Sequence, residues 1–323
     1  MSSRIQHKGI VPGELSLERF DQVAAILFPQ YSRSRLQSWI KSKELLVGGK
    51  PGRSKDKVSA GDIIEIDAVA ETLEDEGEDI PLDIIHEDES IIVVNKPVGL
   101  VVHPGAGNRQ GTLLNALLFH HPDLAEVPRA GIVHRLDKET SGLMVVAKTI
   151  TSQTSLVEQL QSRKVRRIYH AIVYGIPRRN GTIEAAIERH PTHRTKMAVR
   201  FDGKEAITHH NLIEAFDAHA HMEFALETGR THQIRVHMQH LGFPIVGDPV
   251  YGGTFRKPAG DREQLAACLR NFSRQALHAK ELQFRHPESG NSIGFEIDLP
   301  ADIAELLVQL KMAKLKTSKS DGH

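Results

Sequence analysis

The segment GIVHRLDKETSGLMVVAK, residues 131–148, places a polar connection between two strand-like apolar runs, GIVH at 131–134 and GLMVVAK at 142–148. Outward from this segment, strand-like runs outnumber helical ones, and the two kinds do not alternate as in a βαβ fold. The pattern predicts an α+β fold with a mixed, largely antiparallel β-sheet flanked by helices. Further strands are expected at 91–95, 167–175 and 221–227, and helices at 111–120, 152–163, 230–241 and 301–316.

The polar connection HRLDKETSG, at 134–142, is held at both ends by expected sheet, and such braced loops are where catalytic groups concentrate. Asp137 is its natural reactive carboxylate, since Arg135 and Lys138 lie near enough to keep the carboxylate ionised. A turn of Thr, Ser and Gly at 140–142 would fix its position. On local sequence alone, however, an Asp-containing turn with a purely structural role is the stronger interpretation.

A second polar cluster, ETGRTHQIRVHMQHLG at 227–242, is expected to be helical after Gly229 and to place Arg235 one turn after Thr231. Because a guanidinium group keeps its charge, Arg235 would suit a buried carboxylate as a fixed cation, although a surface cation is the commoner outcome. Tyr169 lies in a strand-like run beside two arginines and would suit stacking on a nucleobase. A tyrosine at the edge of the core, with a solvated hydroxyl, is again the commoner outcome.

The chain has 19 histidines, so a metal site has to be weighed. The spacing of His232, His237 and His240 lacks the i, i+4 pair of HExxH sites, and other histidine pairs lack a third ligand at a recognisable spacing. The sequence also lacks GxxxxGK[ST], GxGxxG before a helix, and GxSxG, the signatures of nucleotide binding and serine hydrolysis. We therefore expect neither a metal ion nor a cofactor.

The composition is that of an ordinary globular protein, with 40% hydrophobic and 25% charged residues over 323 positions. The one cysteine, Cys268, allows no internal disulfide and no thiolate metal cluster, which favours an intracellular protein. The start MSSRIQHKG has no apolar stretch typical of a signal peptide, and no apolar run approaches the length of a membrane span. These features predict a soluble cytoplasmic protein.

Charge is segregated along the chain, although Lys plus Arg and Asp plus Glu both number 41. Residues 32–57 include eight basic and two acidic residues, and residues 162–210 include eleven basic and four acidic residues. Between these regions, residues 62–90 include thirteen acidic residues and no Lys or Arg. Zero net charge counts against a nucleic-acid partner, but two basic regions beside an acidic strip can steer and orient a polyanion.

The acidic strip contains AVAETLEDEGEDIP at 68–81, which lacks apolar periodicity and is expected to be a solvated linker. Upstream, residues 1–67 are expected to form two helices followed by a small sheet, with a basic surface that suits a phosphate backbone. Charge alone supports RNA binding and a solvated helix face equally. Downstream, residues 82–310 form the larger expected domain, and 311–323 a flexible tail. The expected RNA-binding residues are Arg33, Arg35, Lys41 and Lys50.

These motifs together resemble those of the RluA-type pseudouridine synthases, in the expected order, from about Leu17 to Pro300. The resemblance rests on several long segments at matching spacing rather than on one short motif. The segments are GIVHRLDKETSGLMVVAKT at 131–149, LETGRTHQIRVHMQHLGFPIVGDPVYG at 226–252, NKPVGLVVHPG at 95–105 and RIYHAIVYG at 167–175.

The N-terminal stretch RFDQVAAILFPQYSRSRLQSWIKSKELLVGGK, at 19–50, resembles the alpha-L (ribosomal S-four type) RNA-binding domain that many family members carry. It departs from that domain at 47–49, where Val-Gly-Gly stands in place of the usual Val-Asn-Gly. The family signature and HPTHRTKMAV at 190–199 are most similar to the RluD subgroup, which modifies large-subunit (23S) ribosomal RNA.

The resemblance implies roles for five residues. Asp137 matches the catalytic aspartate of the family, and Arg235 matches the basic residue that pairs with it. Tyr169 matches the tyrosine that stacks against the target base, and Ile234 the neighbouring apolar contact. Arg135 matches the motif arginine that helps to hold the extruded nucleotide.

The implied activity is a cofactor-free isomerisation of specific uridines, in which the uracil leaves its sugar, turns and is rejoined through carbon-5. The implied partner is large-subunit ribosomal RNA, free or within the subunit, and we expect a monomer that does not bind membranes. Whether Asp137 attacks the sugar or assists its deprotonation stays open, as do the exact uridines. Two alternatives rank lower: a non-catalytic RNA-binding or ribosome-assembly factor that uses the same basic surfaces, and a metallohydrolase that uses the histidines.

Overall fold

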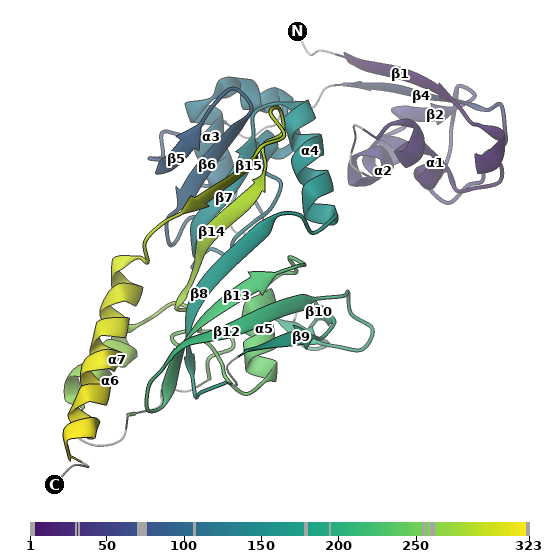
Figure 1. Cartoon of the computed structure of the whole chain (residues 1–323). Coiled ribbons are helices and arrows are strands. Elements are labelled where there is room, and N and C mark those ends of the chain that lie inside the picture. Colours follow the sequence, from purple (N-terminus) through teal and green to yellow (C-terminus); the bar gives the residue numbers. More distant parts are fainter. Residues whose placement is uncertain are drawn as a thin grey trace. The chain divides into compact units, whose positions relative to one another are not determined.

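The computed structural model describes residues 4–29, 31, 33–69, 76–105, 108–177, 180–193, 195–253, 255, 257–258 and 262–320. Its contacts divide the chain into two compact units, residues 1–74 and 75–323 (Figure 1). The division falls within 68–81, the expected linker, of which residues 70–75 lie outside the described part.

The smaller unit packs two helices on a four-stranded antiparallel sheet of order β1-β4-β2-β3. Trp39 and Phe20, from the helices, are its largest buried side chains and pack with strand residues such as Ile64. The first strand was not expected, because its sequence RIQHKGI is polar. In the structure most of its residues are exposed. The elements are β1 (Arg4–Ile10), α1 (Phe20–Leu27), α2 (Arg33–Ser42), β2 (Leu45–Val47), β3 (Lys50–Pro51) and β4 (Ile63–Val69), with the 3-10 turn η1 (Gly13–Leu15) before α1.

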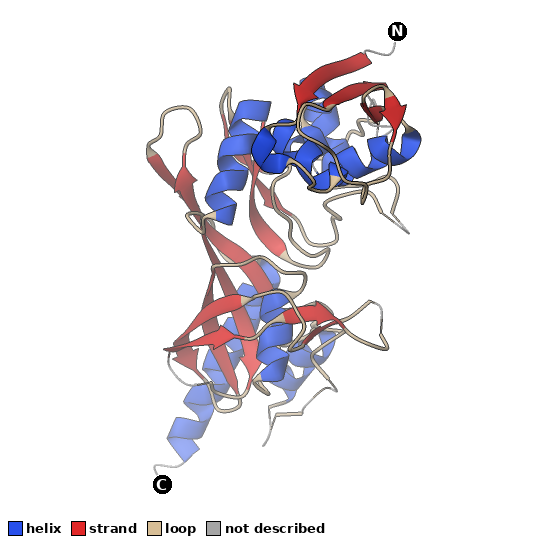
Figure 2. Cartoon of the chain, turned by 90° about the vertical axis from the view of Figure 1, so that its right-hand side faces the viewer, coloured by secondary structure: helices blue, strands red, loops and turns tan. Residues whose placement is uncertain are grey.

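The larger unit is built on a nine-stranded sheet of order β5-β6-β7-β14-β8-β13-β12-β9, in which β15 also pairs with β14. β7 and β14 pair in parallel, and the other pairs are antiparallel, which confirms the expected mixed, largely antiparallel α+β fold. Figure 2 shows the strands as one twisted sheet with helices packed along it. The strands are β5 (Ile84–Glu87), β6 (Ile91–Lys96), β7 (Ser141–Ala147), β8 (Arg166–Tyr174), β9 (Asn180–Glu184), β12 (Ile207–Ala215), β13 (His219–Leu226), β14 (Leu277–Arg285) and β15 (Ser292–Glu296), with a separate hairpin of β10 (Ile187–Arg189) and β11 (Met197–Val199).

Strands β6 and β7 are covered on both faces of the sheet, which explains why their sequences are nearly unbroken apolar runs. Ile92 and Val94 of β6 face one core cluster, whereas Ile91 and Val93 face another that includes Leu156. The helices that line these clusters and the rest of the unit are α3 (Leu113–His120), α4 (Ile150–Gln161), α5 (Gln233–His240), α6 (Glu263–Asn271) and α7 (Ala301–Ser320), with 3-10 turns η2 (Pro122–Glu126) and η3 (Pro128–Gly131).

Residues 131–134 do not form the expected strand. The turn η3 ends at Gly131, and Ile132 makes only an isolated bridge to β7. The backbone at Arg129, Ala130 and Gly131 has positive φ angles, and a Cβ on Gly131 would lie 1.8 Å from the carbonyl oxygen of Ala147. The chain therefore turns tightly against β7, a geometry that apolar periodicity cannot reveal.

The second half of the expected linker is largely exposed but is anchored to the larger unit. The amide of Glu78 donates to the carbonyl of Asn115 on α3, and the Asn115 side chain donates to the carbonyl of Glu76. Ile80 and Leu82 pack against the main core. The high acidic content of this segment conceals these apolar anchors, so only the part before residue 76 is left as a candidate linker.

The C-terminal helix is longer than expected. α7 ends at Ser320 rather than at residue 316 and so includes most of the segment 311–323 that was expected to be a flexible tail; residues 321–323 lie outside the described part. Leu310 and Ala313 are buried in the main core, so the first part of that segment is anchored by packing.

Gly142→Ala is expected to destabilise the larger unit by about 2–3 kcal/mol. Gly142 has φ +120°, and an added Cβ would lie 2.2 Å from the carbonyl oxygen of Ala279 on the parallel neighbour β14. The free energy of unfolding measured in denaturant tests this, with Gly290→Ala as the control, because that glycine also has a positive φ but open space around its Cβ position. Equal effects of the two substitutions would contradict the role of the close approach.

Candidate active site

Asp137 lies in the turn that leads into β7, where its side chain is about five-sixths buried. The amide of Thr140 donates to the Asp137 carbonyl at 3.0 Å and closes the turn. The turn is tied to β14 and its approach as well, because Gln275 donates to the Thr140 hydroxyl and Arg274 donates to the Glu139 carbonyl. The backbone that carries Asp137 is therefore fixed on both sides.

Lys96, the last residue of β6, holds the same turn through hydrogen bonds. Its ammonium group is fully buried and donates to the carbonyls of Pro97, Leu100 and Lys138 at 2.7, 2.9 and 3.1 Å. Burial lowers the pKa of Lys96 to about 8, since the charged form loses its hydration. A lysine in this position links the segment 95–105 to the residue next to Asp137.

Arg235, on α5, is 4% exposed and holds two carboxylates at once. Its Nη1 donates to Oδ2 of Asp137 at 2.9 Å, while Nε and Nη2 donate to the two oxygens of Asp248 at 2.7 and 2.9 Å. Although burial opposes it, the Asp248 and Asp137 carboxylates raise the pKa of Arg235 above its ordinary value. The guanidinium group is thus a permanent cation that joins Asp137 to the fully buried Asp248 side chain.

Asp248 is fixed by backbone donors in addition to Arg235. Its Oδ1 accepts from the amides of Val250 and Tyr251, both at 2.9 Å. The Tyr251 ring lies against the Arg235 guanidinium, whose carbon is 5.0 Å from the ring centre. Asp248 and Tyr251 were not expected as site residues, although both lie in the quoted segment 226–252.

A histidine completes this group of polar side chains. His232 Nδ1 is 2.8 Å from the Tyr251 hydroxyl, and His232 Nε2 is 3.8 Å from Oδ1 of Asp137. Burial lowers the pKa of His232, which favours the neutral ring. From the sequence, His232 is considered only as a possible metal ligand, and its position beside Asp137 is not predicted.

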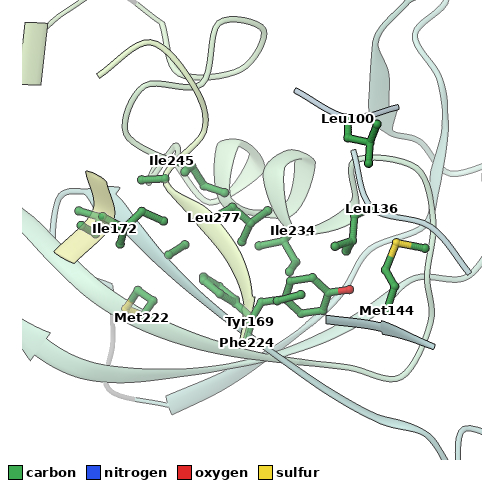
Figure 3. Close-up of a cluster of buried hydrophobic side chains, with 14 of the residues drawn as sticks. Leu100, Leu136, Met144, Tyr169, Ile172, Met222, Phe224, Ile234, Ile245 and Leu277 are labelled. Carbon is green, nitrogen blue, oxygen red and sulfur yellow. The ribbon is translucent and has the colours of Figure 1, made fainter. Parts of the chain in front are cut away.

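Tyr169 and Ile234 lie together in the core beside this site, 6% and 4% exposed. Figure 3 shows the Tyr169 ring close to Ile234, with its hydroxyl directed toward Met144. Burial raises the pKa of Tyr169, so the phenol stays protonated at neutral pH. The structure brings Tyr169, Ile234 and Arg235 to the neighbourhood of Asp137.

Arginines of the same region differ in exposure. Arg135 is exposed. Burial is the main cause that lowers the pKa values of His103 and His232, and the charge of Arg135 adds to the effect. Arg167, two residues before Tyr169, is instead 7% exposed, and its Nη2 approaches the carbonyls of Leu226 and Glu227 at 3.4 and 3.3 Å. Nothing in the sequence indicates that Arg167 is buried while its neighbour Arg166 is exposed.

In the smaller unit, the four expected RNA-binding residues are in two different settings. Arg33 lies within 3.3 Å of the buried Asp21 carboxylate, and the Arg35 guanidinium lies 5.0 Å from the Trp39 ring centre. Lys41 and Lys50 are solvent-exposed. Arg33 and the two lysines are thus accessible to a ligand, whereas Arg35 is half-buried.

Across the described ranges, no group of three or more His, Cys, Asp or Glu side chains is arranged to hold a metal ion. His237, one of the histidines weighed above, is fully buried and uses both nitrogens, since Nε2 donates to the Ala185 carbonyl and Nδ1 accepts from the Thr208 hydroxyl. None of the helices in the described part is long and apolar enough to cross a membrane.

Comparison with known proteins identifies relatives that span nearly the whole chain. Residues 90–240 match the family model described as RNA pseudouridylate synthase. Ribosomal large subunit pseudouridine synthase D of Pseudomonas aeruginosa is 54% identical over 315 residues, which cover 96% of this chain and 98% of that protein. The protein of the same name from Xanthomonas campestris pv. campestris is 53% identical over 305 residues, with 94% and 92% covered.

Solved structures show the same relationship at lower identity. Human RNA pseudouridylate synthase domain containing 4 is 26% identical, has a TM-score of 0.56, and matches 71% of this chain and 92% of that chain. Human RNA pseudouridylate synthase domain containing 1, at 24% identity, has a TM-score of 0.53 over 73% of this chain and 96% of that chain, and so supports the fold alone.

Proposed function

The chain belongs to the RNA pseudouridylate synthase family and is therefore an isomerase, and we propose that it converts specific uridines of large-subunit (23S) ribosomal RNA to pseudouridine with Asp137 as the essential group. The observation that carries this proposal is the ion-pair chain Asp137–Arg235–Asp248 in a buried setting beside Tyr169. The substrate follows from relatives that are more than 50% identical and are named for the large ribosomal subunit.

Pseudouridine formation breaks the bond between C1′ of the sugar and N1 of uracil and forms a bond between C1′ and C5. The C5 proton is lost and N1 gains a proton, so the atoms balance without water, an oxidant or a cofactor. Asp137 acts on the sugar of the target nucleotide, by attack or by assisting deprotonation, and either role needs an ionised carboxylate. Arg235 donates to Oδ2 of that carboxylate and so orients it.

The target uridine has to leave its stack before Asp137 can reach it. Tyr169 offers an aromatic face for the extruded uracil, and Ile234 is the apolar side chain next to that face. Arg135, which is exposed next to the Asp137 turn, is suited to hold the displaced nucleotide or its phosphates. These three residues together bind the substrate, and Asp137 performs the chemistry.

Residues 1–67 form an alpha-L (ribosomal S-four type) RNA-binding domain in this proposal, and 82–310 form the catalytic domain. Support comes from the helix pair and small sheet of the smaller unit and from the exposed lysines Lys41 and Lys50. Arg33 and Arg35 contribute positive charge, although each also contacts its own unit. The protein works as a monomer in the cytoplasm, where its ribosomal substrate is assembled.

Lys41→Gln and Lys50→Gln are each expected to weaken RNA binding and to lower the slope of log Kd against log salt by about 1 per phosphate contact. Both side chains are exposed and carry a charge that the substitution removes. Fluorescence anisotropy with a ribosomal RNA fragment over a salt series measures both quantities. Lys8→Gln is the control, because Lys8 is exposed in the same unit and pairs with Glu65; an equal effect there would contradict a localised RNA surface.

The function is tested by incubating the purified protein with unmodified large-subunit ribosomal RNA, in parallel with assembled large subunits that lack the modification. Chemical mapping of pseudouridine is expected to show new modification at a small number of uridines. Strong RNA binding without any modification of either substrate would instead support the non-catalytic RNA-binding factor. Activity that is lost with a chelator and restored by metal would support the metallohydrolase.

A further inference from the structure

His232 stands immediately before α5 in a backbone conformation that calls for an explanation. Its φ is +58° and its ψ +23°, the left-handed region that non-glycine residues rarely occupy outside functional sites and turns. Its side chain makes no hydrogen bond that caps the helix. The helix start therefore does not account for the position of the imidazole, whose neighbours are Tyr251 and Asp137.

The hydrogen bonds around Tyr251 favour one position for the His232 proton. The Tyr251 oxygen accepts from the amide of Met197 at 2.9 Å, and this amide can only donate. With that bond made, the phenol can donate its proton to His232 Nδ1, which lies 2.8 Å away. A neutral imidazole that accepts at Nδ1 carries its own proton at Nε2.

The Nε2 proton faces the oxygen of Asp137 that Arg235 does not hold. Arg235 binds Oδ2 at 2.9 Å, whereas Nε2 of His232 lies 3.8 Å from Oδ1. That distance is too long for a hydrogen bond but short enough to close by a small movement, and catalytic hydrogen bonds commonly tighten when substrate binds.

We propose that His232 is a positioning residue for Asp137: Tyr251 directs its Nε2 proton toward Oδ1, so that His232 and Arg235 together orient the carboxylate when RNA is bound. The proposal rests on the proposed function, since it assumes that Asp137 is the essential group. In this proposal Met197, Tyr251 and His232 form one hydrogen-bonded chain that leads to the Asp137 carboxylate. Hydrogen bonds to both oxygens restrict rotation of an aspartate side chain and so hold the plane of its carboxylate in one orientation.

The charges that face His232 agree with a neutral ring. Burial lowers its pKa first of all, and the nearby charges act in both directions. The carboxylates of Asp137 and Asp248 favour protonation of the ring, and the guanidinium groups of Arg235 and Arg135 oppose it. The Tyr251 hydroxyl contacts the ring as well.

The test uses single-turnover rates of pseudouridine formation at saturating RNA, with RNA affinity and melting temperature measured on the same full-length proteins. His232→Ala is expected to lower the rate about 10–100-fold with unchanged RNA affinity, the usual effect of removing a group that orients an active-site ligand. His232→Gln, whose amide nitrogen can replace Nε2 as a donor, is expected to recover most of the rate. Tyr251→Phe is expected to lower the rate while leaving the imidazole in place.

A double-mutant cycle separates this role from general packing. In the His232→Ala background, Tyr251→Phe is expected to cause no further loss of rate, because the chain acts only through the histidine. His240→Ala, an exposed histidine at the end of the same helix, is the control. Multiplicative effects of the two substitutions, a rate for His232→Ala within twofold of the parent, or equal rates for Ala and Gln would overturn the proposal. A parent protein that forms no pseudouridine would contradict the proposed function instead.

Discussion

Asp137→Asn is expected to lower the single-turnover rate of pseudouridine formation by about 10⁴-fold or more, the scale seen when an essential catalytic group is removed. Asparagine has the shape of aspartate and retains an oxygen that can accept from Arg235, but it cannot carry the negative charge that the reaction on the sugar needs. The measurement is the initial rate of pseudouridine formation in a ribosomal RNA fragment, with enzyme in excess.

The fold and RNA affinity of the Asp137→Asn protein are expected to stay close to those of the parent. The side chain lies at the surface of the buried network, with 16% of its area exposed, and Asp248 still neutralises Arg235. Asp123→Asn, an exposed carboxylate of the same unit, serves as the matched control. Residual activity within tenfold of the parent would exclude Asp137 as the essential group.

Arg235→Leu is expected to have the second-largest effect, because it damages both stability and catalysis. Breaking a buried ion pair by removing one partner typically costs about 3–5 kcal/mol, since the other charge is left without compensation. Here the uncompensated group is Asp248, whose side chain is fully buried. The rate is expected to fall by about 10²–10³-fold in the fraction that remains folded, as when one preorganised donor is lost.

The double substitution Arg235→Leu with Asp248→Asn separates the two effects. Removing both charges relieves the buried carboxylate, so the free energy of unfolding in denaturant is expected to recover in part while the rate stays low. Arg235→Lys is expected to retain a charge but not the forked contact with two carboxylates, and so to lose activity as well. Recovery of the rate together with stability in the double variant would show that Arg235 serves only the fold.

The sequence predicted the strands that are buried on both faces, such as β6 and β7, because uninterrupted apolar runs identify them. It failed at 131–134, where positive backbone angles at 129–131 replace a strand with a tight turn, and apolar periodicity contains no information on such angles. It also missed the anchoring of 76–81, where Ile80 packs against the main core of the larger unit although the acidic residues suggested an unattached linker.

In the candidate site, too, some residues could be predicted from the sequence and others could not. Spacing alone left Arg235 as a surface cation, and only the family resemblance paired it with Asp137; the structure places the two 2.9 Å apart. Asp248 and Tyr251 lie in the same quoted segment, yet nothing in their spacing shows that the chain after α5 folds back to the Arg235 side chain. Lys96 was likewise hidden, because a fully buried lysine cannot be recognised until the three carbonyls around it are in place.

The most direct test of the central claim is the pseudouridine content of large-subunit ribosomal RNA in cells whose only copy of this protein carries Asp137→Asn. Chemical mapping is expected to show that specific uridines lose the modification in those cells and regain it when an unaltered copy is supplied. Modification at the level of the parent strain, with the Asp137→Asn protein present in normal amount, would contradict the account.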